Sequence, residues 1–155
     1  MIIRPYTSQD SPSITSLSDR LFGKGFFDRW TPSEGICLVA TNPSVIGLIE
    51  FLFKPNGTFL SWIMVDPSQQ RTGVGSTLYS EAMSLLPKAN FYSTCWKESP
   101  SPGIIPFLTN RGWRRSATIL NYWHKDSIDN NYKCIRCGKP CLCTAVVMRL
   151  DVNIP

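Results

Sequence analysis

Apolar residues in the first part of the chain fall into short runs that are separated by turn residues. These runs are rich in β-branched and aromatic residues, as is typical of strands. The dipeptide Asn56-Gly57 between the last two runs is a strong hairpin signal. We therefore predict four strands, of which the last three are antiparallel neighbours. The runs cover residues 2–6, 36–41, 45–53 and 59–65.

Helical periodicity appears in two places. Polar residues at 7–10 are suited to cap a helix that runs up to Phe22, and a short second helix is expected over 26–30. After Val65 the apolar spacing changes to three and four residues, which predicts an amphipathic helix that Pro87 stops. We expect a loop over 97–103 and a short helix over 104–110. Further strands are expected over residues 90–96, 116–124 and 145–150.

A glycine-containing loop joins the strand ending near Val65 to the amphipathic helix. Gly73 and Gly75 have no side chain, so backbone N–H groups there can approach a ligand closely. The first turn of the following helix adds unpaired N–H donors and the positive end of its dipole. Ser76 and Thr77 can add hydroxyl donors, and Arg71 can add charge. These features favour an anion-binding loop over a plain strand-to-helix turn.

The segment from Val65 to Gly75 resembles the main signature of the GNAT family of N-acetyltransferases, with Gln70, Gly73 and Gly75 at its fixed positions. Arg111-Gly112-Trp113 resembles the Gly-Phe that closes the last helix of that family. The resemblance implies an α/β (α+β) fold. Its mixed, mostly antiparallel sheet would have about seven strands, flanked by helices and containing a splayed central strand pair. All of residues 1–155 would form a single domain.

The same resemblance implies acetyl-CoA as co-substrate and transfer of its acetyl group to a primary amine of a small molecule or protein. Backbone groups of 63–65 would contact the pantetheine, and the amides of 70–75 would hold the pyrophosphate. The gap between the strand ending at Val65 and the strand beginning near Phe91 would receive the thioester. The implied cofactor residues are Ile63, Met64, Val65, Gln70, Arg71, Thr72, Gly73, Val74, Gly75 and Ser76.

The chain departs from the family at its usual proton donor. A Tyr often stands four residues before the late Gly, where this sequence has Leu108, and Ser101 falls where an Asn is common. Releasing an unprotonated thiolate near pH 7 costs about 2 kcal/mol, so transfer remains feasible without a general acid. A non-catalytic acyl-CoA sensor is the alternative. The substitutes for the missing donor are Tyr79, Tyr92, Tyr122 and Cys95.

Glu50 is the candidate general base, because it lies inside an otherwise apolar strand where burial would raise its pKa. The alternative is an outward-facing side chain on a one-sided sheet. His124, the only histidine, is expected at a strand end, as a base, a metal neighbour or a surface residue. Asp66 is expected to cap a turn. Trp96, Trp123 and other aromatic residues are either pocket or core residues.

Four of the six cysteines, Cys134, Cys137, Cys141 and Cys143, lie in a Cys-rich excursion over 130–144 between the last two strands. Four thiolates at this spacing suit a structural Zn²⁺, which would stiffen the wall of the acceptor pocket without joining the chemistry. A redox dithiol, two disulfides and an iron–sulfur site are the alternatives. The other two cysteines are predicted to be small buried hydrophobes.

Composition and charge narrow the function classes further. The chain has 16 basic and 11 acidic residues for a net charge of +5, which a zinc tetrathiolate would lower to +3. Since the basic residues are scattered, nucleic acid is a disfavoured partner, although a zinc-dependent interaction module stays a third alternative. The start does not read as a secretory signal, no apolar run is long enough to span a membrane, and a cytoplasmic location is expected. A homodimer is left open.

Overall fold

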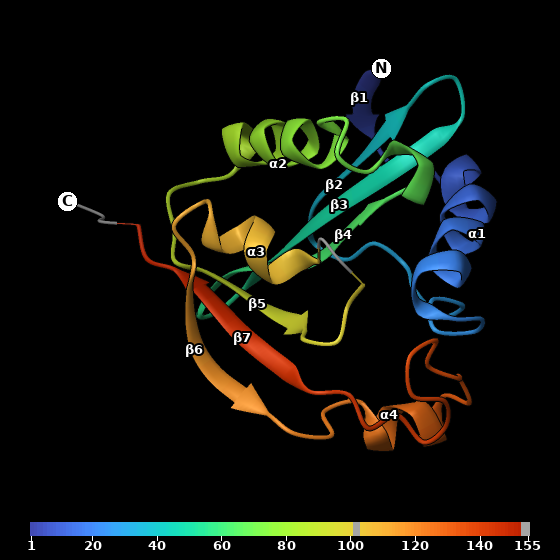
Figure 1. Ribbon diagram of the computed structural model, residues 1–155. Coiled ribbons are helices and arrows are strands. Elements are labelled where there is room, and N and C mark those ends of the chain that lie inside the picture. Colours follow the sequence, from blue (N-terminus) through green and yellow to red (C-terminus); the bar gives the residue numbers. More distant parts are fainter. Residues whose placement is uncertain (101–102, 153–155) are drawn as a thin grey trace.

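The computed structural model describes residues 1–100 and 103–152. These residues form one seven-stranded sheet with the strand order β1-β2-β3-β4-β5-β7-β6 (Figure 1). Only β4 and β5 are parallel, and all the other neighbours are antiparallel. The expected mixed, mostly antiparallel sheet is confirmed. The strands are β1 (Ile2–Pro5), β2 (Gly35–Thr41), β3 (Val45–Lys54), β4 (Gly57–Val65), β5 (Phe91–Trp96), β6 (Arg114–Ile119) and β7 (Ala145–Leu150).

Helices cover both faces of the sheet. On one face, α1 (Ser11–Phe22) buries Ile14 and Leu17 against β3 and β4. On the other face, α2 (Val74–Leu85) and α3 (Ile104–Thr109) contribute Leu78 and Leu108 to the larger core. The fourth helix, α4 (His124–Asp129), lies away from the sheet, beside the cysteine segment (Figure 1). Within the described part of the chain, no helix has the length and apolar character needed to cross a bilayer.

The amphipathic helix predicted from the spacing of apolar residues is confirmed as α2. Its apolar stripe includes Val74, Leu78 and Ala82, all of which are buried. The helix approaches β3 closely at Gly47, where an added Cβ would lie 2.9 Å from the Met64 carbonyl oxygen and 3.0 Å from Leu78. This close approach fixes the N-terminal end of α2, and the loop before it, above the end of β4.

The central parallel pair separates after two residues of pairing. β4 and β5 are in register only at Thr58–Phe91 and Phe59–Tyr92. On the other side of β4, Leu60 pairs with Phe51 and Trp62 with Glu50, so Ser61 is the extra residue of a β-bulge. The splayed central strand pair that the resemblance implied is confirmed, and it leaves the β4 edge from Leu60 to Val65 without a strand partner.

Two predicted elements are wrong. Residues 26–30 form turns in place of a helix, because Gly23 and Gly25 adopt positive φ values of 108° and 87° and the chain bends repeatedly. The strand predicted over 116–124 is displaced: β6 ends at Ile119, where its pairing with β7 ends. His124 consequently begins a helix and does not end a strand.

Candidate functional site

The loop at residues 70–76 presents the open N-terminus of α2. Gly73 is left-handed with φ 94°, and the first bond of the helix runs from the Thr77 N–H to the Gly73 carbonyl at 2.9 Å. The amides of Val74, Gly75 and Ser76 therefore precede the first helical hydrogen bond and point out of the helix end. The Gln70 side chain donates to the Val65 carbonyl at 3.2 Å and ties the loop to β4. This geometry suits an anion.

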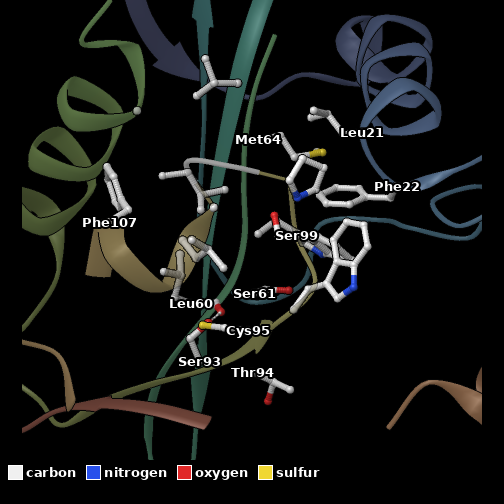
Figure 2. A pocket seen from close by; sticks show the side chains of 18 of the residues that line it. Leu21, Phe22, Leu60, Ser61, Met64, Ser93, Thr94, Cys95, Ser99 and Phe107 are labelled. Atoms are coloured by element: carbon white, nitrogen blue, oxygen red, sulfur yellow. Dashed lines mark hydrogen bonds between the residues drawn. The ribbon is translucent and has the colours of Figure 1, made fainter. Parts of the chain in front are cut away.

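A continuous cleft of about 590 Å³ runs from this loop along the unpaired edge of β4 to the space between the diverging strands. Ile63, Met64 and Val65 line it on one side, and Ser93, Thr94 and Cys95 of β5 line it on the other (Figure 2). Phe107 of α3 lies close to Gly75, since a Cβ added there would be 3.6 Å from its ring. The structure thus brings the predicted cofactor residues into one cavity, with the exception of Thr72 and Val74, whose side chains do not line it.

Arg111 lies beside the loop, a position to which the sequence pattern did not assign a role. Its guanidinium stacks on Phe107, 3.6 Å from the ring centroid, and donates to the Ser76 hydroxyl at 2.8 Å. It also donates to the Phe107 carbonyl at 2.9 Å. These contacts hold a positive charge next to the helix N-terminus. The only sequence signal for Arg111 is its position before the late glycine.

Glu50 is buried with 2% of its surface exposed, so the outward-facing alternative is wrong. The indole N–H of Trp30 donates to its carboxylate at 3.2 Å. Burial raises the pKa of Glu50, and hydrogen bonds from Trp30 and Ser61 oppose the shift because they favour the charged form. Glu50 itself does not line the cleft, whereas Ser61 does. Ser61, the bulge residue of β4, is thus both a hydrogen-bond partner of the carboxylate and part of the cleft wall.

The candidate proton donors divide into two groups. The Tyr79 hydroxyl is buried, away from the cleft, and accepts a 2.9 Å hydrogen bond from the Trp113 indole. Tyr92 stacks with Phe59 and does not line the cleft either. Tyr122 and Cys95 do line it, and burial raises the pKa of Cys95 to about 11, which keeps this thiol protonated at neutral pH.

The residue at the position of the family's usual proton donor belongs to the hydrophobic core. Leu108 is fully buried in the main core under α3. Ser101, at the position of the expected Asn, lies outside the described residues. His124 is exposed at the start of α4 and does not line the cleft. Asp66 caps the turn after β4, as predicted, by accepting from the Ser68 N–H at 2.9 Å.

The cysteines of the C-terminal segment converge, with all four Sγ atoms within 4.8 Å of one another. Three of the separations are 3.7 Å for Cys134–Cys143, 3.6 Å for Cys137–Cys141 and 3.4 Å for Cys137–Cys143. A tetrahedral zinc with Zn–S bonds of about 2.3 Å requires S···S separations of about 3.8 Å. The cluster therefore has nearly the size of a zinc tetrathiolate.

Backbone amides around the cluster support the thiolate form. The Arg136 N–H lies 3.4 Å from the Cys134 Sγ, and the Leu142 N–H lies 3.2 Å from the Cys137 Sγ. Cys134 and Gly138 form an isolated β-bridge that turns the first half of the segment back on itself, with Gly138 at φ 83°. The donor set and the surrounding amides fit Zn²⁺, which prefers sulfur ligands of this kind.

Cys37 and Cys95 lie apart from this cluster. Cys95 is buried as predicted, whereas Cys37 on β2 is only half-buried.

The splayed strand pair and the amide-rich loop before α2 agree with the resemblance of the sequence to N-acetyltransferases. The sequence profile of the Acetyltransferase (GNAT) family matches residues 4–113. The chain belongs to this family, and is an acyltransferase of the N-acetyltransferase type. No match is found among curated protein sequences.

Solved structures share the fold across nearly the whole chain. The ribosomal-protein-S18-alanine N-acetyltransferase from Escherichia coli superposes with a TM-score of 0.73 at 16% identity, covering 99% of this chain and 95% of that one. The Arabidopsis thaliana NAA60 in complex with a bisubstrate analogue gives 0.71 at 10% identity, with 98% of each chain covered. A putative streptothricin acetyltransferase from Bacillus anthracis in complex with acetyl coenzyme A gives 0.67 at 12% identity, covering 97% and 99%. At such identities the likeness shows the fold.

Proposed function

We propose that the protein transfers the acetyl group of acetyl-CoA to the primary amine of a small molecule or protein. The observation that carries this proposal is the continuity of one cleft, which joins the amides of residues 70–76 to the fork between β4 and β5. A pyrophosphate at the loop would direct the pantetheine along residues 63–65. The thioester would then lie at the fork, beside Leu60 and Ser93. Two of the solved relatives were crystallised with acetyl coenzyme A or a bisubstrate analogue, which fits this assignment.

In this proposal, Arg71 and Arg111 supply positive charge at the phosphate end of the cleft. Both line it, and Arg111 is held in place by its contacts with Ser76 and Phe107. Amides that precede the first bond of α2 add donors without any reorganisation. The cofactor is therefore bound mainly by groups that the fold positions in advance.

Glu50 is the proposed general base. It would receive the amine proton through the Ser61 hydroxyl, since Ser61 borders the cleft and Glu50 does not. A raised pKa brings a carboxylate closer to the operating pH, which suits proton abstraction. Proximity of the amine to the thioester supplies a further part of the rate.

We propose that the four cysteines hold one structural Zn²⁺. Four thiolate ligands leave no open coordination position, so the ion would act on the shape of the protein and not on the substrate. Cys134 and Cys141 also line the cleft. The metal would therefore stiffen the wall against which an acceptor packs. A cytoplasmic location remains our prediction for this protein.

The test is to incubate the metal-loaded protein with acetyl-CoA and a panel of primary amines, and to follow release of the CoA thiol. We expect release that depends on the amine and saturates with it. A non-catalytic acyl-CoA sensor is the second candidate, because Leu108 fills the position of the family proton donor. Calorimetric binding of acetyl-CoA without thiol release for any amine would favour the sensor, and absence of binding would exclude both.

A further inference from the structure

The end of the cleft far from the phosphate loop is lined by aromatic rings. We call it the aromatic end, and its residues come from α1, the following turns, β4, β5 and the start of the cysteine segment. We propose that it selects an acceptor whose primary amine is joined by a short carbon chain to an aromatic ring. This inference rests on the acetyl transfer proposed above. The residues of the aromatic end are Phe22, Phe26, Trp62, Trp96 and Tyr132.

The rings of the aromatic end contact one another to form a continuous surface. Phe26 lies with ring-centroid separations of 5.6 Å from Phe22, 5.5 Å from Trp62 and 4.8 Å from Tyr132. Trp96 lies 6.1 Å from Phe22. All these rings except Tyr132 are only partly buried, in contrast to Phe27, whose side chain is 2% exposed. A concave surface of partly exposed rings is typical of a binding site for an apolar group.

The side chains that line the cleft favour an acceptor with few charges. Among the described residues that line the cleft, Arg71 and Arg111 are the charged ones, and both lie at the phosphate end. No carboxylate is among the described residues that line the cleft, so none there can pair directly with a second or third ammonium group. A polycationic acceptor would thus enter without carboxylate partners for its additional ammonium groups, which is unfavourable. A single ammonium can instead be held over aromatic faces.

The cysteine cluster attracts ammonium groups in general and does not choose between acceptors. Cys134 and Cys141 border the aromatic end, and a zinc tetrathiolate carries a net charge of −2. Its field attracts amines into the cleft whatever their number of charges, so the discrimination between acceptors rests on the rings. The Tyr132 ring is fixed beside it by the hydrogen bond that its hydroxyl donates to Asp126 at 2.8 Å.

The positions of the rings set the length of the acceptor. Trp62 directly follows the bulge residue Ser61, and Trp96 directly follows Cys95, which flanks the fork. Figure 2 shows Phe22 reaching from α1 towards the same space. From a thioester beside Leu60 and Ser93, Trp62 lies two residues further along β4 and Trp96 three residues further along β5, so a short spacer can join nitrogen and ring. Phenylethylamine and a peptide with N-terminal Phe both have a short N–C–C–ring spacer.

The experiment compares acceptors of the metal-loaded protein by thiol release and, independently, by calorimetric binding to its complex with CoA. The probes are 2-phenylethylamine and the peptide Phe-Gly-Gly against putrescine and an aminoglycoside. We expect at least one aromatic amine to exceed both polar amines in kcat/KM by about tenfold or more. Preference for 2-phenylethylamine would indicate a small-molecule acceptor, and preference for Phe-Gly-Gly would indicate the N-terminus of a polypeptide.

Variants locate the preference in the aromatic end. Phe26→Ala should raise the KM for the aromatic amine about tenfold and leave the KM for acetyl-CoA unchanged. Phe26→Leu keeps the apolar volume, so it preserves folding while removing the ring, and should show the same direction of change. The matched control is Phe53→Ala, on an exposed phenylalanine at the end of β3.

The outcomes separate this inference from the proposed activity. If the polar amines are acetylated with a kcat/KM equal to or higher than that of the aromatic amines, the aromatic preference is overturned and the proposed acetyl transfer is supported. Calorimetric binding of an aromatic amine that Phe26→Leu weakens, without turnover, would support the aromatic end and overturn the activity. If no aromatic amine binds and none is acetylated, the inference is overturned.

Discussion

The Ser93 hydroxyl on β5 donates a hydrogen bond of 2.8 Å to the Leu60 carbonyl on β4, directly after the last residue pair that joins these two strands. Ser93 is 4% exposed and the Leu60 side chain is 1% exposed. The carbonyl has no strand partner on this side, so the serine side chain satisfies it in place of a backbone amide. This bond lies at the apex of the fork where we place the thioester.

Ser93→Ala should destabilise the fold, because it leaves a buried carbonyl without a partner. We expect the free energy of unfolding, measured with urea, to fall by about 1–3 kcal/mol. The control is Ser84→Ala on the exposed side of α2, which should change it by no more than about 0.5 kcal/mol. Equal stability of both variants would contradict the role assigned to this hydrogen bond.

Gly75→Ala should separate cofactor binding from stability. Gly75 lies in α2, and an added Cβ would meet Val65, Phe107 and Ile63 at ordinary distances of 3.5–4.0 Å, so the variant should fold normally. The methyl group would nevertheless stand at the cleft wall between β4 and Phe107. We expect acetyl-CoA to bind about tenfold more weakly by calorimetry, with an unchanged melting temperature.

The matched control for this variant is Ser80→Ala, which places the same methyl group on the exposed face of the same helix. It should bind acetyl-CoA as the unmodified protein does. If Gly75→Ala also binds normally, the cofactor does not occupy the cleft at this point.

Glu50→Gln tests the general base through pH dependence. A base is active when ionised, so the rate should rise as pH passes through the raised pKa of Glu50. The variant should lose this rise and about 10²-fold or more in kcat. The same pKa shift affects the free energy of unfolding, because the pKa of Glu50 is higher in the folded protein than in the unfolded chain. Protonated Glu50 therefore contributes its full stabilisation below the unfolded pKa, and this contribution is lost as pH rises through the folded pKa. Glu50→Gln should remove that loss.

Trp30→Phe provides a second measurement on the same group. It removes the indole N–H that donates to Glu50 at 3.2 Å and so favours the charged form. The rising limb of the pH–rate profile should therefore shift to higher pH. An unchanged profile in both variants would exclude Glu50 as the base.

Cys141→Ser tests the metal. Elemental analysis of the unmodified protein should give one zinc per chain, and the variant should lose it together with several kcal/mol of stability at the cysteine segment. Chelation should have the same effect on the unmodified protein. The control is Cys37→Ser, a change on β2 that should retain the zinc. Full metal content in Cys141→Ser would contradict tetrathiolate binding.

The phosphate loop, α2 and the cysteine cluster could be predicted from the sequence because each depends on residues close together in the chain. Glycines before an apolar stripe of period 3.6 fix the loop and helix, and short spacing brings four thiols together. Local pattern failed at residues 26–30 and 120–124. There, positive φ values and the end of β6–β7 pairing override the apolar spacing.

The sequence by itself thus determined the glycine loop before α2, where we propose that acyl-CoA is held, and which four thiols would meet. Only the tertiary structure decided that Glu50 faces inward behind the bulge, that Tyr79 bonds to Trp113, and that a fork opens between β4 and β5. It also decided that rings from α1, two strands and the cysteine segment share one cleft. The physical reason is that alternation along a strand fixes which residues share a face, while strand order and register fix what that face meets.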